Sequence, residues 1–182
     1  MQELAVSLPK LSGLQQLSLT FSRCKDGTID SLLTHMTSFS SLTCLEIMHA
    51  RLPDASVYLL NHALGKMPSL ARLSLSNTAL GASGVTLLSK SLPTLTTLSF
   101  LSLSNCPFGD RGAGLLADSL KSLFKLRELH LNATKVTDHG AIALLASLSH
   151  VFLTHVRLRN NDRMKSNGAS HMDALKEPWI FL

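Results

Sequence analysis

The hexapeptide Leu98-Ser-Phe-Leu101-Ser-Leu103 decides the fold, because its pattern recurs along the chain at a fixed interval. The first leucines of the successive copies are Leu14, Leu42, Leu70, Leu98 and Leu126, which are evenly spaced. A degenerate sixth copy, residues 153–158, begins one residue earlier than this spacing requires. A unit that repeats at this length predicts a solenoid, in which function is sought on a repeated surface rather than in one closed pocket.

The second half of the unit keeps the same phase as the first. Glycines recur at Gly84, Gly112, Gly140 and Gly168, at the same interval as the leucines. After each of the first three glycines, apolar residues at spacings of three and four predict a helix with one buried face. Asp110 precedes one such helix, and we expect its carboxylate to cap that helix, as Asp54 and Asp138 would cap theirs.

The first half of the unit predicts a short strand. In Leu101-Ser102-Leu103 the alternation has the period of two that places both leucines on one face. Parallel strands stack about 4.8 Å apart, whereas helices need about 8–10 Å, so the stack must bend with its strands inside. We therefore predict an α/β fold: a curved right-handed solenoid with parallel strands on the concave face and helices on the convex face.

The two halves together resemble leucine-rich repeats, whose consensus is L-x-x-L-x-L-x-x-N/C-x-L. The 28-residue length is similar to that of the ribonuclease-inhibitor-like subclass. The phrases Leu101-Ser-Leu-Ser-Asn-Cys106 and Leu115-Leu-Ala-Asp-Ser-Leu120 are most similar to the repeat region of a NOD-like receptor (NLR). The chain departs from the consensus at the Asn or Cys position, which holds Ser22, Ala50, Thr78, Cys106 and Thr134.

We expect residues 1–182 to form a single leucine-rich repeat domain. About six repeats would start near 14, 42, 70, 98, 126 and 153, after a partial repeat at 1–13. An irregular tail is expected at 176–182, because Pro178 breaks the last helical pattern and no further strand pattern follows. The partial repeat and the apolar last residues predict that the chain is a fragment of a larger protein.

Composition narrows the class of partner and the compartment. The net charge of +5 comes from scattered basic residues without a run, so nucleic acid is not the expected partner. Three cysteines give no disulfide framework; Cys24 and Cys106 are interpreted as core thiols, and Cys44 as a residue of the concave side. Neither a signal peptide nor a membrane span is predicted, which favours the cytoplasm, with the nucleus as the alternative.

The sequence predicts neither an enzyme nor a cofactor or metal site. None of the eight histidines stands at a ligand spacing such as H-E-x-x-H, and no pair of C-x-x-C motifs is present. There is also no G-x-S-x-G elbow around a nucleophilic serine. The glycines of residues 109–114 have equivalents in other repeats, and we interpret them as a turn into a helix rather than a phosphate loop.

Strand residues that point away from the leucine core should form the concave surface in three rows. The first row is Gln16, Cys44, Arg72, Phe100, Glu128 and His155. The second is Ser18, Glu46, Ser74, Ser102, His130 and Arg157. The third is Thr20, Met48, Ser76, Ser104, Asn132 and Arg159.

From these rows we select seven candidates for contact with a partner: Met48, Arg72, Phe100, Glu128, His130, Arg157 and Arg159. Phe100 and Met48 are large apolar groups at positions expected to face water. Such groups often anchor interfaces, although partial burial by neighbouring side chains is the alternative. The serines at the centre of the rows are interpreted as small polar residues tolerated on a strand, not as a site.

The resemblance implies a module for protein–protein interaction or ligand recognition. In NOD-like receptors such repeats follow a nucleotide-binding domain, sense ligands and help to keep the protein inactive. We therefore expect protein partners on the concave face, and a nucleotide-binding domain outside this chain. Two alternatives remain open: the substrate-recognition repeats of an F-box-type ubiquitin ligase receptor, since Thr137-Asp-x-Gly140 also occurs there, and a regulator of an enzyme or a GTPase.

Overall fold

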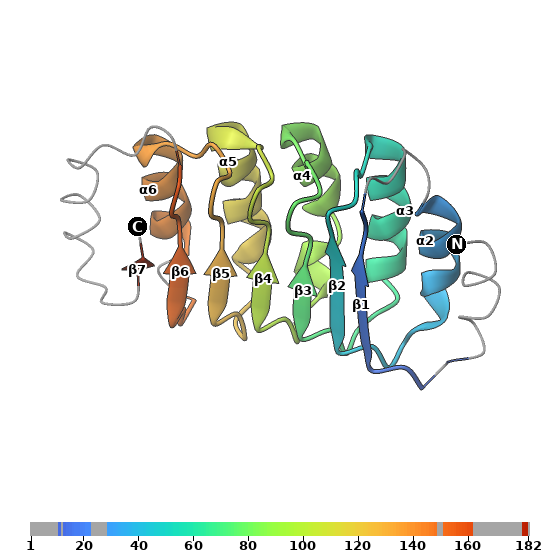
Figure 1. Cartoon of the computed structure of the whole chain (residues 1–182). Helices are drawn as coiled ribbons and strands as arrows, with labels where there is room; N and C mark the ends of the chain where they lie inside the picture. Colours follow the sequence, from blue (N-terminus) through green and yellow to red (C-terminus); the bar gives the residue numbers. More distant parts are fainter. Residues whose placement is uncertain (1–10, 12, 23–28, 149–150, 162–179, 182) are drawn as a thin grey trace.

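The computed structural model describes residues 11, 13–22, 29–148, 151–161 and 180–181, and strands alternate with helices along these residues (Figure 1). The strands form one parallel sheet in chain order: β1 (Gln16–Thr20), β2 (Cys44–Met48), β3 (Arg72–Ser74), β4 (Phe100–Ser102), β5 (Glu128–His130), β6 (His155–Arg157) and β7 (Ile180–Phe181). The α-helices are α2 (Asp30–His35), α3 (Asp54–Leu64), α4 (Ala82–Leu88), α5 (Gly109–Leu120) and α6 (Asp138–Ser147). Two short 3-10 helices are η2 (Met36–Ser38) and η3 (Leu92–Thr94).

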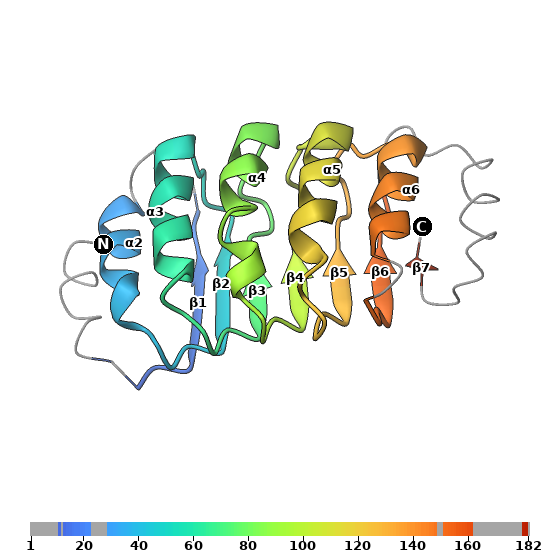
Figure 2. The same cartoon turned by 180° about the vertical axis from the view of Figure 1, so that it is seen from behind.

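The helices lie on one side of the sheet only. Figure 1 shows the strands in front of the helices, and Figure 2, seen from behind, shows the helices in front of the strands. One face of the sheet is therefore packed against helices, and the other is free of them in the part of the chain that the structure describes. This arrangement confirms the predicted α/β solenoid with parallel strands on its concave face.

The register of the sheet follows the sequence period. Gln16 pairs with Cys44, Cys44 with Arg72, and Arg72 with Phe100, so each residue pairs with its equivalent in the next repeat. Phe100 then pairs with Glu128, and Glu128 with His155. The first two predicted rows are confirmed. In the third row the pairing of Thr20 with Met48 is confirmed, but β3 to β6 end before the remaining members.

The core lies between the sheet and the helices. The strand leucines Leu45, Leu73, Leu101 and Leu129 are fully buried. The helices contribute Leu60, Leu88, Leu116 and Leu144, which hold equivalent places in successive repeats and are fully buried as well. Burial of one leucine side chain stabilises a fold by roughly 1.5–3 kcal/mol. Because the leucines of one repeat pack against the adjacent repeat, the stability of each repeat depends on its neighbours.

In four repeats the side chain at the consensus Asn or Cys position forms hydrogen bonds at the turn that follows the strand. Thr78 donates its hydroxyl to the carbonyl of Leu75 at 2.7 Å, and the Cys106 thiol approaches the same carbonyl at 3.2 Å. Asn161 supplies the consensus Asn in the sixth repeat, where Oδ1 accepts from the Thr134 amide at 2.8 Å. The offset that leads from Leu126 to Thr134 also leads from Leu153 to Asn161, so the repeat pattern marks Asn161 as well.

The prediction that Asp110 caps its own helix is wrong. Helix α5 begins at Gly109, so Asp110 is already its second residue and is not at the cap position. Its carboxylate instead accepts from the amide and the hydroxyl of Thr137 at 2.7 and 2.6 Å, in the next repeat. Asp54 likewise gives α3 no side-chain cap and accepts from Ser83 at 3.0 Å.

Helix α6 shows the same difference. Its cap is Thr137, whose side chain accepts from the amide of His139, rather than the predicted Asp138. Asp54 and Asp110 therefore connect one helix to the next, and the start of a helix in this fold depends on the preceding repeat.

Of the tail expected at 176–182, the structure describes only Ile180 and Phe181, and the other tail residues lie outside the described residues. Ile180 pairs with Val156 and Phe181 with Arg157, so β7 continues the sheet. Cys24, Gly168 and most of the partial repeat at 1–13 lie outside the described residues.

Candidate protein-binding surface

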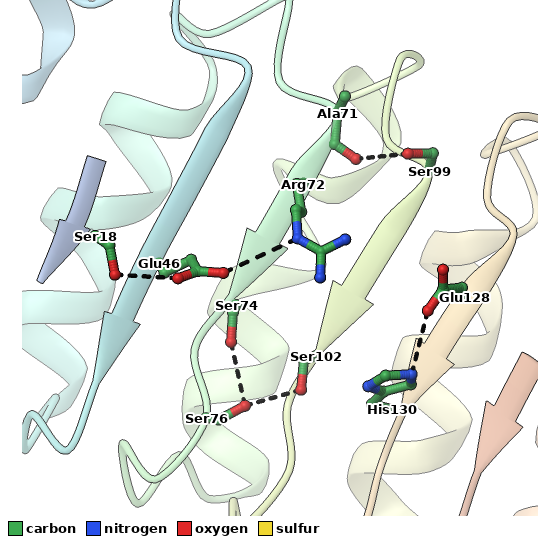
Figure 3. Close-up of polar contacts among 10 residues, drawn as sticks. All are labelled: Ser18, Glu46, Ala71, Arg72, Ser74, Ser76, Ser99, Ser102, Glu128 and His130. Atoms are coloured by element: carbon green, nitrogen blue, oxygen red, sulfur yellow. Dashed lines mark hydrogen bonds and ion pairs between the residues drawn. The ribbon is translucent and has the colours of Figure 1, made fainter. Parts of the chain in front are cut away.

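The open face of the sheet carries two rows of side chains that we call the concave surface. Its first row is Gln16, Cys44, Arg72, Phe100, Glu128 and His155, and its second row is Ser18, Glu46, Ser74, Ser102, His130 and Arg157. Figure 3 shows that polar contacts join neighbouring strands across this surface. The surface is therefore a connected set of side chains rather than a series of separate ones.

Phe100 is buried, with only 7% of its surface exposed. The guanidinium of Arg72 lies over its ring, 3.6 Å from the centroid, and His130 meets the ring edge-on at 4.8 Å between centroids. The expectation that Phe100 faces water is wrong, because side chains of the two adjacent strands cover it. The alternative of burial by neighbours is the one that the structure shows.

Arg72 is held from two sides. Its Nε lies 3.9 Å from Oε1 of Glu46, and Glu46 accepts a hydrogen bond from the Ser18 hydroxyl at 3.0 Å through its other oxygen. On the other side the guanidinium stacks on Phe100. The Arg72 side chain still keeps 46% of its surface exposed, so it is a positioned cation that a partner can reach.

The serines at the centre of the concave surface bond to one another. Ser76 forms hydrogen bonds with Ser74 at 3.2 Å and with Ser102 at 2.8 Å (Figure 3). Ser74 and Ser102 are buried. These hydroxyls therefore support the sheet from its concave side and offer little contact area to a partner.

His130 is a partly buried histidine with charged neighbours. Its Nε2 lies 3.5 Å from Oε2 of Glu128, and its ring packs on Phe100. Burial lowers the pKa of His130, and the positive charge of Arg157 lowers it further, against the opposing effect of Glu128. The neutral imidazole is thus favoured near pH 7.

The remaining candidates differ in how far a partner can reach them. Arg157 and Arg159 are exposed at the C-terminal end of the sheet, and Glu128 keeps 40% of its side chain exposed. Met48, at the end of β2, is half-buried. The sequence thus placed Arg72, Glu128, Arg157 and Arg159 on an accessible surface, whereas Phe100 and much of His130 lie beneath it.

A depression of about 510 Å³ opens on the concave surface beside Arg72. It is lined by Gln16, Leu17, Ser18, Cys44, Glu46 and Arg72. The thiol of Cys44 is not activated there, because burial and the nearby Glu46 carboxylate raise its pKa. The chemistry of this depression is therefore that of a charged pair, not of a nucleophile.

Three other observations bear on the expected sites. Cys106 is fully buried, as predicted for a core thiol, and burial raises its pKa. Within the described residues, no group of three or more His, Cys, Asp or Glu side chains could hold a metal ion. Nor does any helix in that part of the chain have the length and apolar content to cross a bilayer.

Large apolar side chains are also exposed away from the concave surface. Tyr58, on α3, keeps 66% of its surface exposed, Phe124 65% and Phe152 80%. Phe124 and Phe152 precede β5 and β6, at loop positions that the strand pattern did not single out. The two phenylalanines are 28 residues apart, but the earlier members of the same series are Ser40, Pro68 and Thr96, so the aromatic side chain is not repeated along the chain.

Comparison with known proteins agrees with the geometry. A family model described as leucine rich repeat matches residues 94–117 and 122–145. The solved structure of leiomodin-1 actin-binding site 2 is similar, with 18% identity and a TM-score of 0.58 over 63% of this chain and 69% of that chain.

A second solved structure, an internalin (inlF) from Listeria monocytogenes str. 4b F2365, is 20% identical with a TM-score of 0.48. The match covers 94% of this chain and 54% of that one. No curated protein matches the chain. The family model and the leiomodin-1 structure both agree with the repeat architecture described above.

Proposed function

We propose that this chain binds a protein partner on its concave surface, because it is a leucine-rich repeat protein and such repeats form protein-interaction modules. The observation that carries the proposal is that accessible charged side chains lie along the open face of the sheet and that one of them, Arg72, is held in place. Arg72 is positioned by Glu46 and Phe100, and Arg157 is exposed three strands further on. Side chains that are already ordered lose less conformational entropy when a partner binds.

The proposal also explains why the concave surface contains a buried aromatic and bonded serines. These groups make the floor of the surface rigid, while the charged groups above it remain accessible. Charge on such a surface gives specificity and speeds association more than it adds affinity. A partner would therefore be selected by the pattern of charges along β3 to β6.

Photo-crosslinking tests this placement. A benzophenone amino acid replaces Gln16 or Arg157 on the concave surface, and Tyr58 or Arg111 on the convex helices, in cells that express the protein. We expect the two concave positions to crosslink one common protein that the two convex positions do not capture. If only convex positions capture it, the proposed surface is wrong.

A charge-reversal pair adds an independent measurement. Arg157→Glu should weaken binding of that crosslinked protein by about tenfold, since a like-charge contact replaces an attractive one. Arg111→Glu makes the same change in net charge on exposed α5 and serves as the matched control. Equal weakening by both variants would indicate a general charge effect rather than a concave site.

We further propose that the chain is the sensing and autoinhibitory part of a NOD-like innate immune receptor. The support is the 28-residue period and the repeat phrases quoted above. Mapping the 5′ end of the natural transcript tests this role. A P-loop nucleotide-binding domain encoded before Met1 is the expected result, whereas an F-box would assign the repeats to ubiquitin ligation and overturn the receptor proposal.

A further inference from the structure

We propose that Arg72 binds a carboxylate of the protein partner, so that the partner presents an acidic segment to the centre of the concave surface. This inference rests on the proposed function and names the chemistry that the surface would recognise. Three features of Arg72 support it: the direction of the guanidinium donors, the contacts that hold the guanidinium in place, and the charges of the neighbouring side chains.

The donors of Arg72 are only partly used within the protein. Nε faces Glu46 at 3.9 Å, which is an ion-pair distance and too long for a hydrogen bond. Figure 3 shows the two terminal nitrogens on the side of the guanidinium away from Glu46. Neither terminal nitrogen has a hydrogen-bond partner among the described residues. A planar fork of N–H donors matches the two oxygens of a carboxylate.

The guanidinium is also held in place before any ligand arrives. Its plane is supported by the Phe100 ring at 3.6 Å, and that ring is fixed in turn by the edge contact of His130. A free arginine side chain loses rotamer entropy when it is immobilised, and much of that cost has already been met during folding. Arg72 is thus better prepared to bind than an arginine on a convex helix.

The surrounding charges favour an anion. Of the two glutamates of the concave surface, Glu46 is engaged, since it bonds Ser18 and faces Arg72. Glu128 keeps 40% of its side chain exposed beside His130, whose lowered pKa favours the neutral ring. Arg72 and Arg157 are exposed cations on this face of the sheet, and Arg159, just after β6, is exposed as well. Because β3 and β6 are three strand spacings apart, Arg72 and Arg157 lie roughly 15 Å from each other.

That separation sets an expected spacing in the ligand. An extended peptide advances about 3.3 Å per residue and its side chains alternate between two faces, so two carboxylates about four residues apart would lie on one face and reach both arginines. A partner strand that crosses β3 to β6 with acidic residues at this interval fits the charges. An acidic segment, rather than an apolar one, is the occupant that this surface selects.

NMR titration of the whole ¹⁵N-labelled chain tests the inference. The probe is a short Gly-Ser peptide with two glutamates about four residues apart, and its control has glutamine at both places. The side-chain Nε–H resonances of the arginines and the backbone amides of β3 to β6 are followed. We expect the glutamate peptide to shift the Arg72 resonance in a saturable way, and the glutamine peptide to leave it unchanged.

Variants separate a specific fork from general attraction. Arg72→Gln should lower the affinity for the glutamate peptide by about tenfold. Arg72→Lys should lower it by several-fold, since lysine keeps the charge but loses the planar fork. Arg111→Gln removes the same charge from α5 and should leave the affinity unchanged. Equal weakening by Arg72→Gln and Arg111→Gln, or full binding to the Arg72→Gln variant, would overturn the proposal.

Binding of the natural partner shows whether only the carboxylate contact at Arg72 is wrong or the proposed function itself. If the crosslinked protein still binds the Arg72→Gln variant with wild-type affinity, the concave surface remains the binding site and only the carboxylate contact is wrong. If no protein crosslinks at the concave positions, the proposed function itself is wrong.

Discussion

The guanidinium carbon of Arg72 lies 3.6 Å from the centroid of the Phe100 ring, although the two residues belong to different repeats. Their direct pairing in the sheet register produces this contact. The pair turns a side chain that the alternation directs toward solvent into a buried one. It also fixes the cation that stands at the centre of the proposed binding surface.

Removing the arginine should therefore expose the ring. We expect Arg72→Ala to lower the free energy of unfolding by about 0.5–1 kcal/mol, because a cation–π contact and the cover over Phe100 are both lost. In a Phe100→Leu background the same change should cost less. Chemical denaturation of the two single variants and the double variant measures this coupling. Equal costs in both backgrounds would show that the contact contributes nothing to stability.

The packing of Asp110 on the next helix makes Gly140 sensitive to substitution. A Cβ at Gly140 would collide with the Asp110 side chain, which bonds Thr137. Gly140→Ala should destabilise the protein by about 1–3 kcal/mol, in the range for overpacking. Gly114→Ala is the matched control, because a Cβ there meets no atom within 4 Å.

In α5 the control change should even stabilise, by up to about 1 kcal/mol, since alanine is the better helix former. Thermal unfolding monitored by circular dichroism compares the two variants. A free-energy change of about 1 kcal/mol corresponds to a shift in Tm of roughly 2–4 °C for a chain of this size. Two shifts of the same sign and size would contradict the packing described for Gly140.

Ala133 lies in the left-handed region of backbone space, with φ of 53°. The equivalent places in other repeats hold Asn77, Asn105 and Asn160, residues that tolerate this conformation better. Ala133→Gly should therefore stabilise the chain by up to about 1 kcal/mol, because glycine relieves the Cβ strain.

The opposite sign is expected for the same substitution in a helix. Ala143, on α6, is exposed, and Ala143→Gly should cost about 1 kcal/mol through lost helix propensity. Urea denaturation of both variants provides the comparison. Destabilisation by Ala133→Gly as large as that by Ala143→Gly would mean that the turn is not strained.

His130 should make stability depend on pH. Its pKa is lowered in the folded state by burial and by Arg157, whereas in the unfolded chain it returns to about 6.5. Between these two values the unfolded state binds more protons, so stability is fully present above about pH 6.5 and declines as pH falls toward the folded pKa. Urea midpoints from pH 7.5 to 5 measure the decline, and His130→Gln should flatten it.

Much of the fold follows from sequence period alone. Leucines at the first, fourth and sixth places of each hexapeptide predicted the strand, its register and the side that faces the core, and Leu45, Leu73 and Leu101 are all fully buried. These features depend on local alternation and on a repeat of fixed length, and both can be recognised from the order of residues along the chain. The same rule placed Arg72, Phe100 and Glu128 in one row.

Only the tertiary structure decided which concave residues a partner can reach. Leu101 and Ser102 point to opposite faces as predicted, yet both are buried, at 0% and 5% exposure. Accessibility depends on side chains of adjacent repeats, such as Arg72 over Phe100, and no pattern within one repeat encodes which rotamer its neighbour adopts. For the same reason the sequence assigned Asp110 to its own helix, whereas the stacking of repeats gives its carboxylate to Thr137.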